Sequence, residues 1–156
     1  MRKIAIIISI IVLITIDLIS KWFFQSHFED IPYSPLLGDI FGVQLSYNTG
    51  VAFSFPIPSL ALKILTVFLI AIICIYFIRT EYPKKSKLLD IGYTFILAGA
   101  LSHAYERIIK GYVVDFFSLK YFAIFNFADI IITIGALLLF VYYFFYDRTN
   151  AKLKSK

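Results

Sequence analysis

Two aspartates beside apolar segments are the residues best suited to chemistry in this sequence. Asp115 lies in Gly-Tyr-Val-Val-Asp-Phe-Phe, and Asp129 lies in Phe-Asn-Phe-Ala-Asp. Ionisable groups at the edge of hydrocarbon are energetically unfavourable, so their presence there indicates a function. If the two carboxyl groups lie close together, the pair holds one proton near neutral pH. One carboxylate can then take a proton from water while the other acid donates one to a peptide carbonyl or leaving amine, which is aspartic-peptidase chemistry.

Other catalytic chemistries find little support in the sequence. Ser102 has no lysine or second histidine placed to form a dyad with it, and the chain has no His-Glu-x-x-His motif. A metal bound by His103 together with the two aspartates would lack a second nearby histidine. Cys74 lies inside an apolar run, which excludes a disulfide and is typical of a small packing residue. We therefore expect no metal and no cofactor.

The composition predicts that an integral membrane protein positions these side chains. Hydrophobic residues make up 60% of the 156 residues and aromatic residues 19%, which is more than a soluble domain of this size can bury. A helix needs about 20 mostly apolar residues to cross a bilayer, and four stretches meet this condition: residues 4–24, 60–78, 88–108 and 127–146. We predict an all-α membrane protein with four transmembrane helices, in which residues 1–156 form one domain. The first stretch carries Asp17 and Lys21 and is too long for a cleaved signal peptide, so we expect it to be retained.

The positions of lysine and arginine predict how these helices are oriented. Basic residues precede the first helix, lie between the second and third, and form the tail at residues 147–156, so these segments should be cytoplasmic. The loops at residues 25–59 and 107–126 should then face outward. This topology collects polar residues at the outer face: Asp17, Lys21, Glu106, Arg107, Asp115 and Asp129. The net charge of +5 follows from the same asymmetry and gives no support to nucleic-acid binding.

The two outer loops predict a small β platform on the membrane surface. Residues 40–47 alternate apolar with polar or small side chains, as a strand does, and Asn48 and Gly50 follow in a turn sequence. Residues 111–117 are rich in β-branched and aromatic side chains and should add extended structure beside this strand. Such a platform could hold a peptide by strand addition.

Five short motifs, taken in order, resemble those of lipoprotein signal peptidase, also called signal peptidase II. The motifs are Asp17-Leu-Ile-Ser-Lys21, Asn48-Thr-Gly-Val-Ala-Phe53, Glu106-Arg107, Val114-Asp-Phe116 and Phe125-Asn-Phe-Ala-Asp129 with Gly135. The resemblance spans nearly the whole chain. It implies an aspartic endopeptidase of the bacterial cytoplasmic (inner) membrane that removes signal peptides from prolipoproteins. It implies that this enzyme cuts before a diacylglyceryl-modified cysteine, that its site faces the extracytoplasmic side among membrane lipids, and that the cyclic peptide globomycin inhibits it.

The resemblance also implies roles for single residues. Asp115 and Asp129 match the catalytic pair of the family, and the matching supporting residues are Asp17, Asn48, Arg107 and Asn126. We predict further supporting or substrate-positioning roles for Lys21, Gly50, His103 and Glu106. Residues 102–107 depart from the family pattern, because His103 replaces an asparagine and Glu106 replaces an aspartate. The two positions are three apart and share a helix face, so the changes could be coupled and could alter substrate positioning and pH dependence.

Simpler interpretations exist for several of these residues. Asp17 and Lys21 are four apart on a helix and could only neutralise each other. His103 with Glu106 could be a packing pair, Arg107 an interfacial anchor and Asn48 a turn former.

Three functions remain open from the sequence, and the peptidase is favoured. It requires the two carboxyl groups to lie close together at a groove open to lipid. A catalytically impaired relative that binds or assembles lipoproteins is kept open by His103 and Glu106, although both aspartates are retained. A small proton-coupled transporter would need polar residues through the membrane midplane or inverted repeats. The second and fourth apolar stretches are nearly free of such residues.

Overall fold

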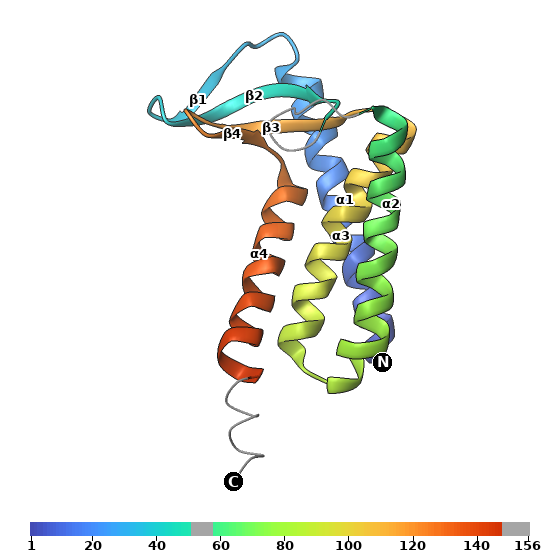
Figure 1. Cartoon of the computed structure of the whole chain (residues 1–156). Coiled ribbons are helices and arrows are strands. Elements are labelled where there is room, and N and C mark those ends of the chain that lie inside the picture. The colour runs from blue at the N-terminus through green and yellow to red at the C-terminus, as the bar shows by residue number, and fades with distance from the viewer. Residues whose placement is uncertain (51–57, 148–156) are drawn as a thin grey trace.

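The computed structural model of the chain describes residues 1–50 and 58–147. In that part of the chain, long helices stand side by side beneath a small sheet (Figure 1). The long helices are α1 (Arg2–Phe28), α2 (Ser59–Tyr76), α3 (Lys87–Ile109) and α4 (Phe127–Val141). Shorter helical segments continue α2 and α4: η2 (Phe77–Glu81), η3 (Tyr82–Lys84) and η4 (Tyr142–Asp147). The end of the second motif, at Phe53, and the basic tail from residue 148 lie outside the described residues.

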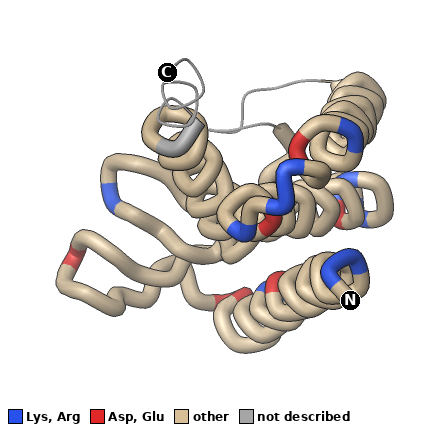
Figure 2. Tube along the Cα trace, turned by 90° about the horizontal axis from the view of Figure 1, so that it is seen from below, with Lys and Arg blue, Asp and Glu red and all other residues tan. Residues whose placement is uncertain are grey.

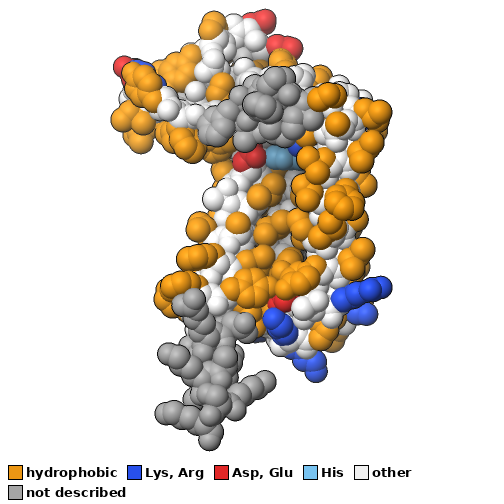
Figure 3. All heavy atoms as spheres, in the orientation of Figure 1, with side chains coloured by type: hydrophobic (Ala, Val, Ile, Leu, Met, Phe, Trp, Pro, Cys, Tyr) orange, Lys and Arg blue, Asp and Glu red, His pale blue; other side chains and the backbone are white. Residues whose placement is uncertain are grey.

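Most of the helical surface is apolar, as expected for contact with lipid. Among the described residues, three helical segments are long and apolar enough to cross a membrane: Arg2–Phe28, Ser59–Lys84 and Phe127–Phe145. Their apolar side chains stay largely exposed, and Figure 3 shows them covering the sides of the helices. Exposed isoleucine, leucine and phenylalanine over such lengths suit a hydrocarbon solvent. The chain is therefore a multi-pass membrane protein.

Helix α3 lies at the centre of the bundle and buries more polar side chains than α1, α2 or α4. It contacts α1, α2 and α4, and many of its residues are buried, including Ser102 and Glu106. Its polar groups therefore turn towards neighbouring helices. This burial explains why the segment is long enough to span a membrane yet less apolar than α1, α2 and α4.

Small residues allow α3 and α4 to approach closely. A methyl group added at Gly135 of α4 would lie 2.7 Å from the carbonyl oxygen of Gly92 in α3. A methyl group at Gly99 would lie 2.7 Å from the carbonyl oxygen of Ala128, the residue before Asp129. Small residues at such crossings let helix backbones pack against each other in membranes. The contact thus brings the amino-terminal end of α4 against the half of α3 nearer the sheet.

Four antiparallel strands form the sheet, in the order β1-β2-β3-β4. The strands are β1 (Ser34–Leu37), β2 (Phe41–Asn48), β3 (Val113–Leu119) and β4 (Ala123–Phe125). Strands β2 and β3 come from the two loops in which the sequence predicted extended structure, and their pairing places Ser46 opposite Asp115. The predicted small sheet built from both loops is therefore confirmed, and β1 and β4 extend it on either side.

Gly111 makes the connection from α3 into β3. Its φ of 84° lies in the left-handed region, where glycine is favoured. Its N–H donates to the carbonyl oxygen of Glu106 over 3.1 Å, which ends the helix in a common carboxy-terminal cap. The chain then enters β3 at Val113, two residues before Asp115. In β3, Phe116 turns to the opposite face and stacks on Phe24 of α1, with ring centroids 4.2 Å apart.

Basic residues gather at the end of the bundle opposite the sheet. Viewed from that end, lysine and arginine mark the start of α1 and the turn between α2 and α3 (Figure 2). They are Arg2, Lys3, Arg79, Lys84, Lys85 and Lys87. Arg2 forms an ion pair with Asp90 of α3 at 2.6 Å. An apolar cluster including Phe77, Leu89 and Tyr93 lies at this same end.

Candidate active site

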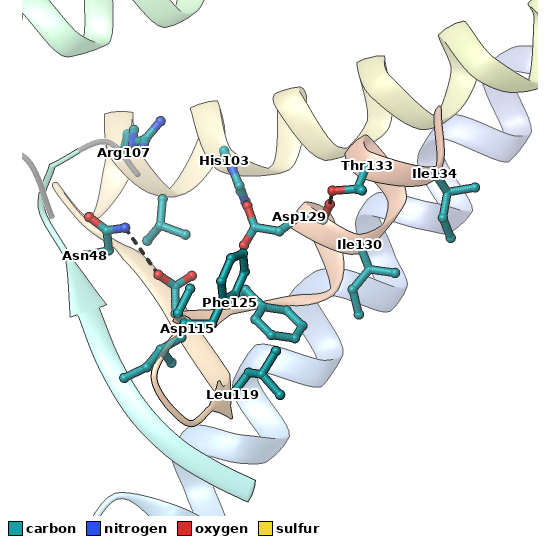
Figure 4. Close-up of a pocket in the computed structure, with 14 residues that line it drawn as sticks. Asn48, His103, Arg107, Asp115, Leu119, Phe125, Asp129, Ile130, Thr133 and Ile134 are labelled. Atoms are coloured by element: carbon teal, nitrogen blue, oxygen red, sulfur yellow. Dashed lines mark hydrogen bonds and ion pairs between the residues drawn. The ribbon is translucent and has the colours of Figure 1, made fainter. Parts of the chain in front are cut away.

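Asp115 and Asp129 line one cavity between the sheet and the upper ends of α3 and α4. The cavity has a volume of about 670 Å³, and its other polar lining residues are Asn48, His103, Arg107 and Thr133. Figure 4 shows both aspartates facing the same space, one from β3 and one from α4. In the space-filling view, acidic and histidine side chains are visible in a recess beneath the sheet (Figure 3). The two aspartates that the sequence predicted to share a site thus line the same cavity.

The rest of the cavity lining is apolar. Ile130 and Ile134 line it from α4, and Ile124 and Phe125 line it from β4. The cavity thus combines the polar groups around the aspartates with apolar side chains of α4 and β4. A peptide with an attached hydrocarbon chain would meet both environments in one site.

Asp115 is held by two side-chain amides in a nearly dry position. Its side chain is buried, with the residue only 4% exposed. Asn126 donates from Nδ2 to Oδ1 over 2.5 Å, and Asn48 donates from Nδ2 to Oδ2 over 3.3 Å. Burial, and then the negative charge of Asp129, raise the pKa of Asp115 from its ordinary value of 3.8 to about 6. The two amides oppose this rise but do not cancel it.

Asp129 occupies a different environment at the start of α4. It is the third residue of the helix and forms a capping box, in which its Oδ2 accepts from the N–H of Asn126 over 3.0 Å. In return, its own N–H donates to Asn126 Oδ1 over 3.1 Å. Its side chain is 40% exposed towards the cavity. The amino-terminal end of a helix stabilises negative charge, so this position favours a carboxylate that is open to water.

Asn126 connects the two aspartates. Its side chain is fully buried and also donates to the carbonyl oxygen of Val114 over 3.3 Å. Because Nδ2 donates to Asp115 and Val114, Oδ1 is the acceptor that receives the N–H of Asp129. His103 Nε2 lies 3.2 Å from the same Oδ1 and 3.7 Å from Asp129 Oδ1. His103 must therefore carry a hydrogen on Nε2, since an oxygen cannot donate to it.

Arg107 and Asn48 hold the turn that follows β2 against the site. Asn48 Oδ1 accepts from the N–H of Gly50 over 3.0 Å, the pattern of a side chain that forms its own turn. Arg107 donates from Nη2 to the carbonyl oxygen of Gly50 over 2.9 Å. The turn reading of Asn48 is therefore correct, and the same side chain also contacts Asp115. Gly50 therefore contributes to the site only through its backbone N–H and carbonyl oxygen.

A second polar group lies behind the cavity. Asp17 and Lys21 of α1 form an ion pair at 2.6 Å, and Lys21 also lies 2.7 Å from Glu106 of α3. Ser102 donates to Asp17 over 2.5 Å, and Lys110 pairs with Glu106 at 3.1 Å. In the described structure these residues are not part of the cavity lining. The predicted gathering at one face is found, but it divides into a layer lining the cavity and a layer behind it.

His103 and Glu106 do not act on the same partners. His103 turns to Asn126 and Asp129, whereas Glu106 turns to Lys21, Lys110 and the backbone of β3. Although helical spacing predicted one shared face, their side chains therefore point into the two different layers. Ser102, considered from the sequence only as a nucleophile, is instead a buried donor to Asp17.

One feature of this site was overlooked in the sequence. Asn126 and Asp129 are spaced as a capping box before an apolar run, and this spacing alone indicates a helix start at residue 127.

The chain is similar to lipoprotein signal peptidases over most of its length. The sequence model of the Signal peptidase (SPase) II family matches residues 9–145. A lipoprotein signal peptidase of Pseudomonas aeruginosa is 36% identical over 137 residues, which cover 83% of this chain and 81% of that protein. One of Fusobacterium nucleatum is 34% identical over 141 residues, which cover 88% of this chain and 85% of that protein.

The fold also has solved counterparts. The structure of a bacterial membrane enzyme superposes with a TM-score of 0.79 at 22% sequence identity, over 94% of this chain and 90% of that one. A second such structure superposes with a TM-score of 0.78 at 21% identity, over 91% of this chain and 94% of that one. The arrangement of helices and sheet is thus shared with bacterial membrane enzymes.

Proposed function

The chain belongs to the signal peptidase II family of aspartic peptidases, and we propose that it removes signal peptides from lipid-modified prolipoproteins with Asp115 and Asp129 as catalytic residues. The observation that carries this proposal is the shared amide of Asn126, which contacts both aspartates while they face one cavity. Both acids are present with hydrogen-bond partners in place. This favours an active peptidase over an impaired relative that only binds lipoproteins.

The unequal surroundings of the two aspartates support a different role for each. Asp115, whose pKa is raised to about 6, is the group that holds the proton. Asp129, open to the cavity and placed at a helix start, is the carboxylate that accepts a proton from water. Water attacks the scissile carbonyl carbon, its proton passes to Asp129, and the Asp115 proton passes to the carbonyl oxygen. The tetrahedral intermediate then breaks its C–N bond as Asp129 donates its proton to the leaving nitrogen. One hydroxyl of the intermediate returns its proton to Asp115, which leaves a carboxylic acid product and restores the starting pair.

Four neighbouring residues would support this step without exchanging protons: His103, Asn126, Asn48 and Arg107. Asn126 and Asn48 orient the Asp115 carboxyl group, and His103 fixes the amide of Asn126. Arg107 holds the turn at Gly50, so the wall of the cavity next to Asn48 keeps its place. Positioned groups of this kind lower the barrier by removing the need to reorganise during the reaction.

The cavity suggests how a lipid-modified substrate would bind. The scissile peptide would lie between the aspartates beside β4, a short edge strand that can accept another strand. The diacylglyceryl chains would lie against Ile130 and Ile134 of α4, where membrane lipid already surrounds the helix. Each buried methylene contributes about 0.8 kcal/mol, so an unlipidated precursor should be a poor substrate. A globomycin-type cyclic peptide would compete for the same cavity.

The charge distribution supports a specific membrane topology. All four long helices, α3 included, would span the bilayer as one domain, with both termini in the cytoplasm. Six lysine and arginine residues at the end opposite the sheet would face the cytoplasm. The cavity would then open on the extracytoplasmic side of the bacterial inner membrane, where lipid-modified precursors are exposed.

Cleavage by the purified protein in detergent tests the proposal. The native chain should cut a diacylglyceryl-modified prolipoprotein directly before the lipidated cysteine, as measured by the masses of both products. The same precursor without lipid should be cut far more slowly. A native chain that binds the lipidated precursor but never cuts it would instead support the binding or assembly role.

A further inference from the structure

A buried ion pair on α1 lies behind the proposed dyad. The side chains of Asp17 and Lys21 are 0% and 1% exposed, and their charged atoms are 2.6 Å apart. Two charges buried this deeply are weak contributors to stability, because desolvation offsets most of their attraction. A helix surrounded by lipid has no need of such a pair for its own sake. Its contacts beyond α1 indicate what the pair does.

Asp17 reaches the helix that carries Asp129. Its Oδ1 accepts a hydrogen bond from the N–H of Ala128 over 2.8 Å, and Ala128 is the residue directly before Asp129. The first N–H groups of a helix lack partners within the helix, so this carboxylate caps α4 from outside. Ser102 of α3 donates to the other oxygen, Oδ2, over 2.5 Å. The start of α4 is thereby tied to both α1 and α3.

Lys21 reaches the strand that carries Asp115, through Glu106. Its Nζ lies 2.7 Å from Glu106 Oε2, and the same oxygen accepts from the N–H of Val114 over 3.4 Å. Val114 is the residue directly before Asp115, and its carbonyl oxygen accepts from Asn126. Both backbone polar groups of Val114 are therefore held by side chains from outside β3.

We propose that Asp17, Lys21 and Glu106 form a positioning chain that sets where Asp115 and Asp129 lie relative to each other. One end of the chain holds the residue before Asp129, and the other end holds the residue before Asp115. Its members act through the backbone and do not touch the substrate. This inference rests on the proposed function, because it assigns a role towards the proposed catalytic pair.

The charges of the chain are balanced without the dyad. Asp17 and Glu106 contribute two carboxylates, and Lys21 and Lys110 contribute two ammonium groups, all in direct contact. The positioning chain together with Lys110 is therefore neutral and needs no charge from the cavity. Removing one member leaves a buried charge without its partner and frees one end of the chain.

The length of Glu106 matters to this role. Its two carboxylate oxygens serve Lys110, Lys21 and the N–H of Val114 together. An aspartate at this position keeps the charge but is one methylene shorter, so it would pair with lysine and lose Val114. Glu106→Asp thus separates the positioning contact from the ion pair itself.

The ion pair between Arg2 and Asp90 provides a matched control. It also joins α1 to α3, at 2.6 Å, but at the end of the bundle opposite the sheet. In the described structure neither residue lines the cavity. Asp90→Asn should lower thermal stability without changing the chemistry at the dyad.

The first experiment measures steady-state cleavage and thermal midpoint for Asp17→Asn, Glu106→Asp and Asp90→Asn. Displacing catalytic groups by about 1 Å lowers rates by roughly 100-fold. We therefore expect Asp17→Asn and Glu106→Asp to lower kcat by roughly 10- to 100-fold, with KM changed less than about threefold. Asp90→Asn should lower only the thermal midpoint. The proposal is overturned if the first two variants keep native kcat, or if their loss of activity merely follows their thermal midpoint as in Asp90→Asn.

A second experiment does not depend on cleavage. The protonated carboxyl band of Asp115, assigned by its loss in Asp115→Asn, is followed by infrared spectroscopy against pH. The charged and titratable groups around Asp115 are Asp129 from α4, His103 and Arg107 from α3, and Lys21 of α1 behind the cavity. Moving it away from Asp129 should lower the pH at which the band disappears, by about one unit. An unchanged titration in Glu106→Asp would refute the positioning role even if the native chain cleaves nothing, which would itself refute only the proposed function.

Discussion

Asn126 donates a hydrogen bond to Asp115 Oδ1 over 2.5 Å from the same side chain whose oxygen caps the helix of Asp129. One amide therefore has two tasks, starting α4 and orienting an acid on β3. The position of Asp115 is coupled to the start of that helix, because a shift of either one strains the same side chain. The two tasks can be separated by mutation.

Asn126→Ser should keep the helix cap and lose the link to Asp115. Serine is a good capping residue but is too short to reach the Asp115 carboxyl group. We expect a thermal midpoint near that of the native chain and a kcat lower by roughly 10- to 100-fold. Asn126→Ala removes both contacts and should also destabilise the protein by about 1 kcal/mol. Equal kcat in Asn126→Ser and the native chain would show that the amide serves α4 alone.

The pKa of Asp115 predicts the pH dependence of the reaction. The acid must be protonated to donate to the carbonyl oxygen, and its pKa is raised to about 6, so kcat/KM should fall as pH rises through about 6. A bound substrate excludes water and should raise this pKa further, so the corresponding fall in kcat should lie at higher pH. Stopped-time assays over a pH series measure both. A kcat/KM that rises through this range would contradict the assignment of Asp115 as the acid.

The same raised pKa predicts an effect on stability. Between pH 3.8 and about 6 the folded protein holds a proton on Asp115 that the unfolded chain releases. The unfolded state binds fewer protons there, so the contribution of Asp115 to stability falls as pH rises across this window. Asp115→Asn imitates the protonated acid and should raise the thermal midpoint above pH 6 while abolishing cleavage. Asp39→Asn, an exposed change in the β1–β2 turn, should do neither.

His103 should act through Asn126. Its Nε2 hydrogen donates to Asn126 Oδ1, so His103→Leu removes a donor and should lower kcat severalfold. His103→Asn can present an amide N–H to the same oxygen and should retain most of the activity. The comparison is made at one pH well below 6 and one well above it. Equal activity of the leucine and asparagine variants would show that the hydrogen bond from His103 to Asn126 does not contribute to catalysis.

The close approach of α3 and α4 should be sensitive to one methyl group. A Cβ at Gly99 would lie 2.7 Å from the carbonyl oxygen of Ala128, so Gly99→Ala must displace the start of α4. We expect destabilisation by about 1–3 kcal/mol together with reduced kcat. Ala71→Val, on the exposed face of α2, adds methyl groups towards lipid and should change neither quantity. An unchanged Gly99→Ala enzyme would mean that the helices have room to adjust.

Hydropathy and residue pattern predicted the helices and strands of this fold better than they predicted the contacts between them. The four apolar stretches correspond to α1 to α4. Alternation identified β2, and a high content of β-branched and aromatic residues identified β3. Strand β1 contains Pro35 and exposed leucines, and β4 has only three residues, so neither has a pattern to detect. These two strands exist because β2 and β3 offer them partners.

In the candidate site, too, the sequence predicted which residues gather but not which of them contact each other. Charge bias and helix direction predicted that Asp17, Lys21 and Glu106 would meet the dyad at one end of the bundle. Whether a side chain lines the cavity or lies behind it depends on how α1 packs against α3, which helical spacing does not specify. Glu106 illustrates this, since its neighbour His103, three residues away, faces the cavity while Glu106 faces Lys21.

The decisive test of the catalytic pair is single-turnover cleavage of a diacylglyceryl-modified prolipoprotein. Asp115→Asn and Asp129→Asn are compared with the native chain and Asp39→Asn. The native chain and Asp39→Asn should cut before the lipidated cysteine, while both dyad variants should bind the precursor and leave it intact. Cleavage by either dyad variant at a rate near that of the native chain would contradict the assignment of Asp115 and Asp129 as the catalytic pair.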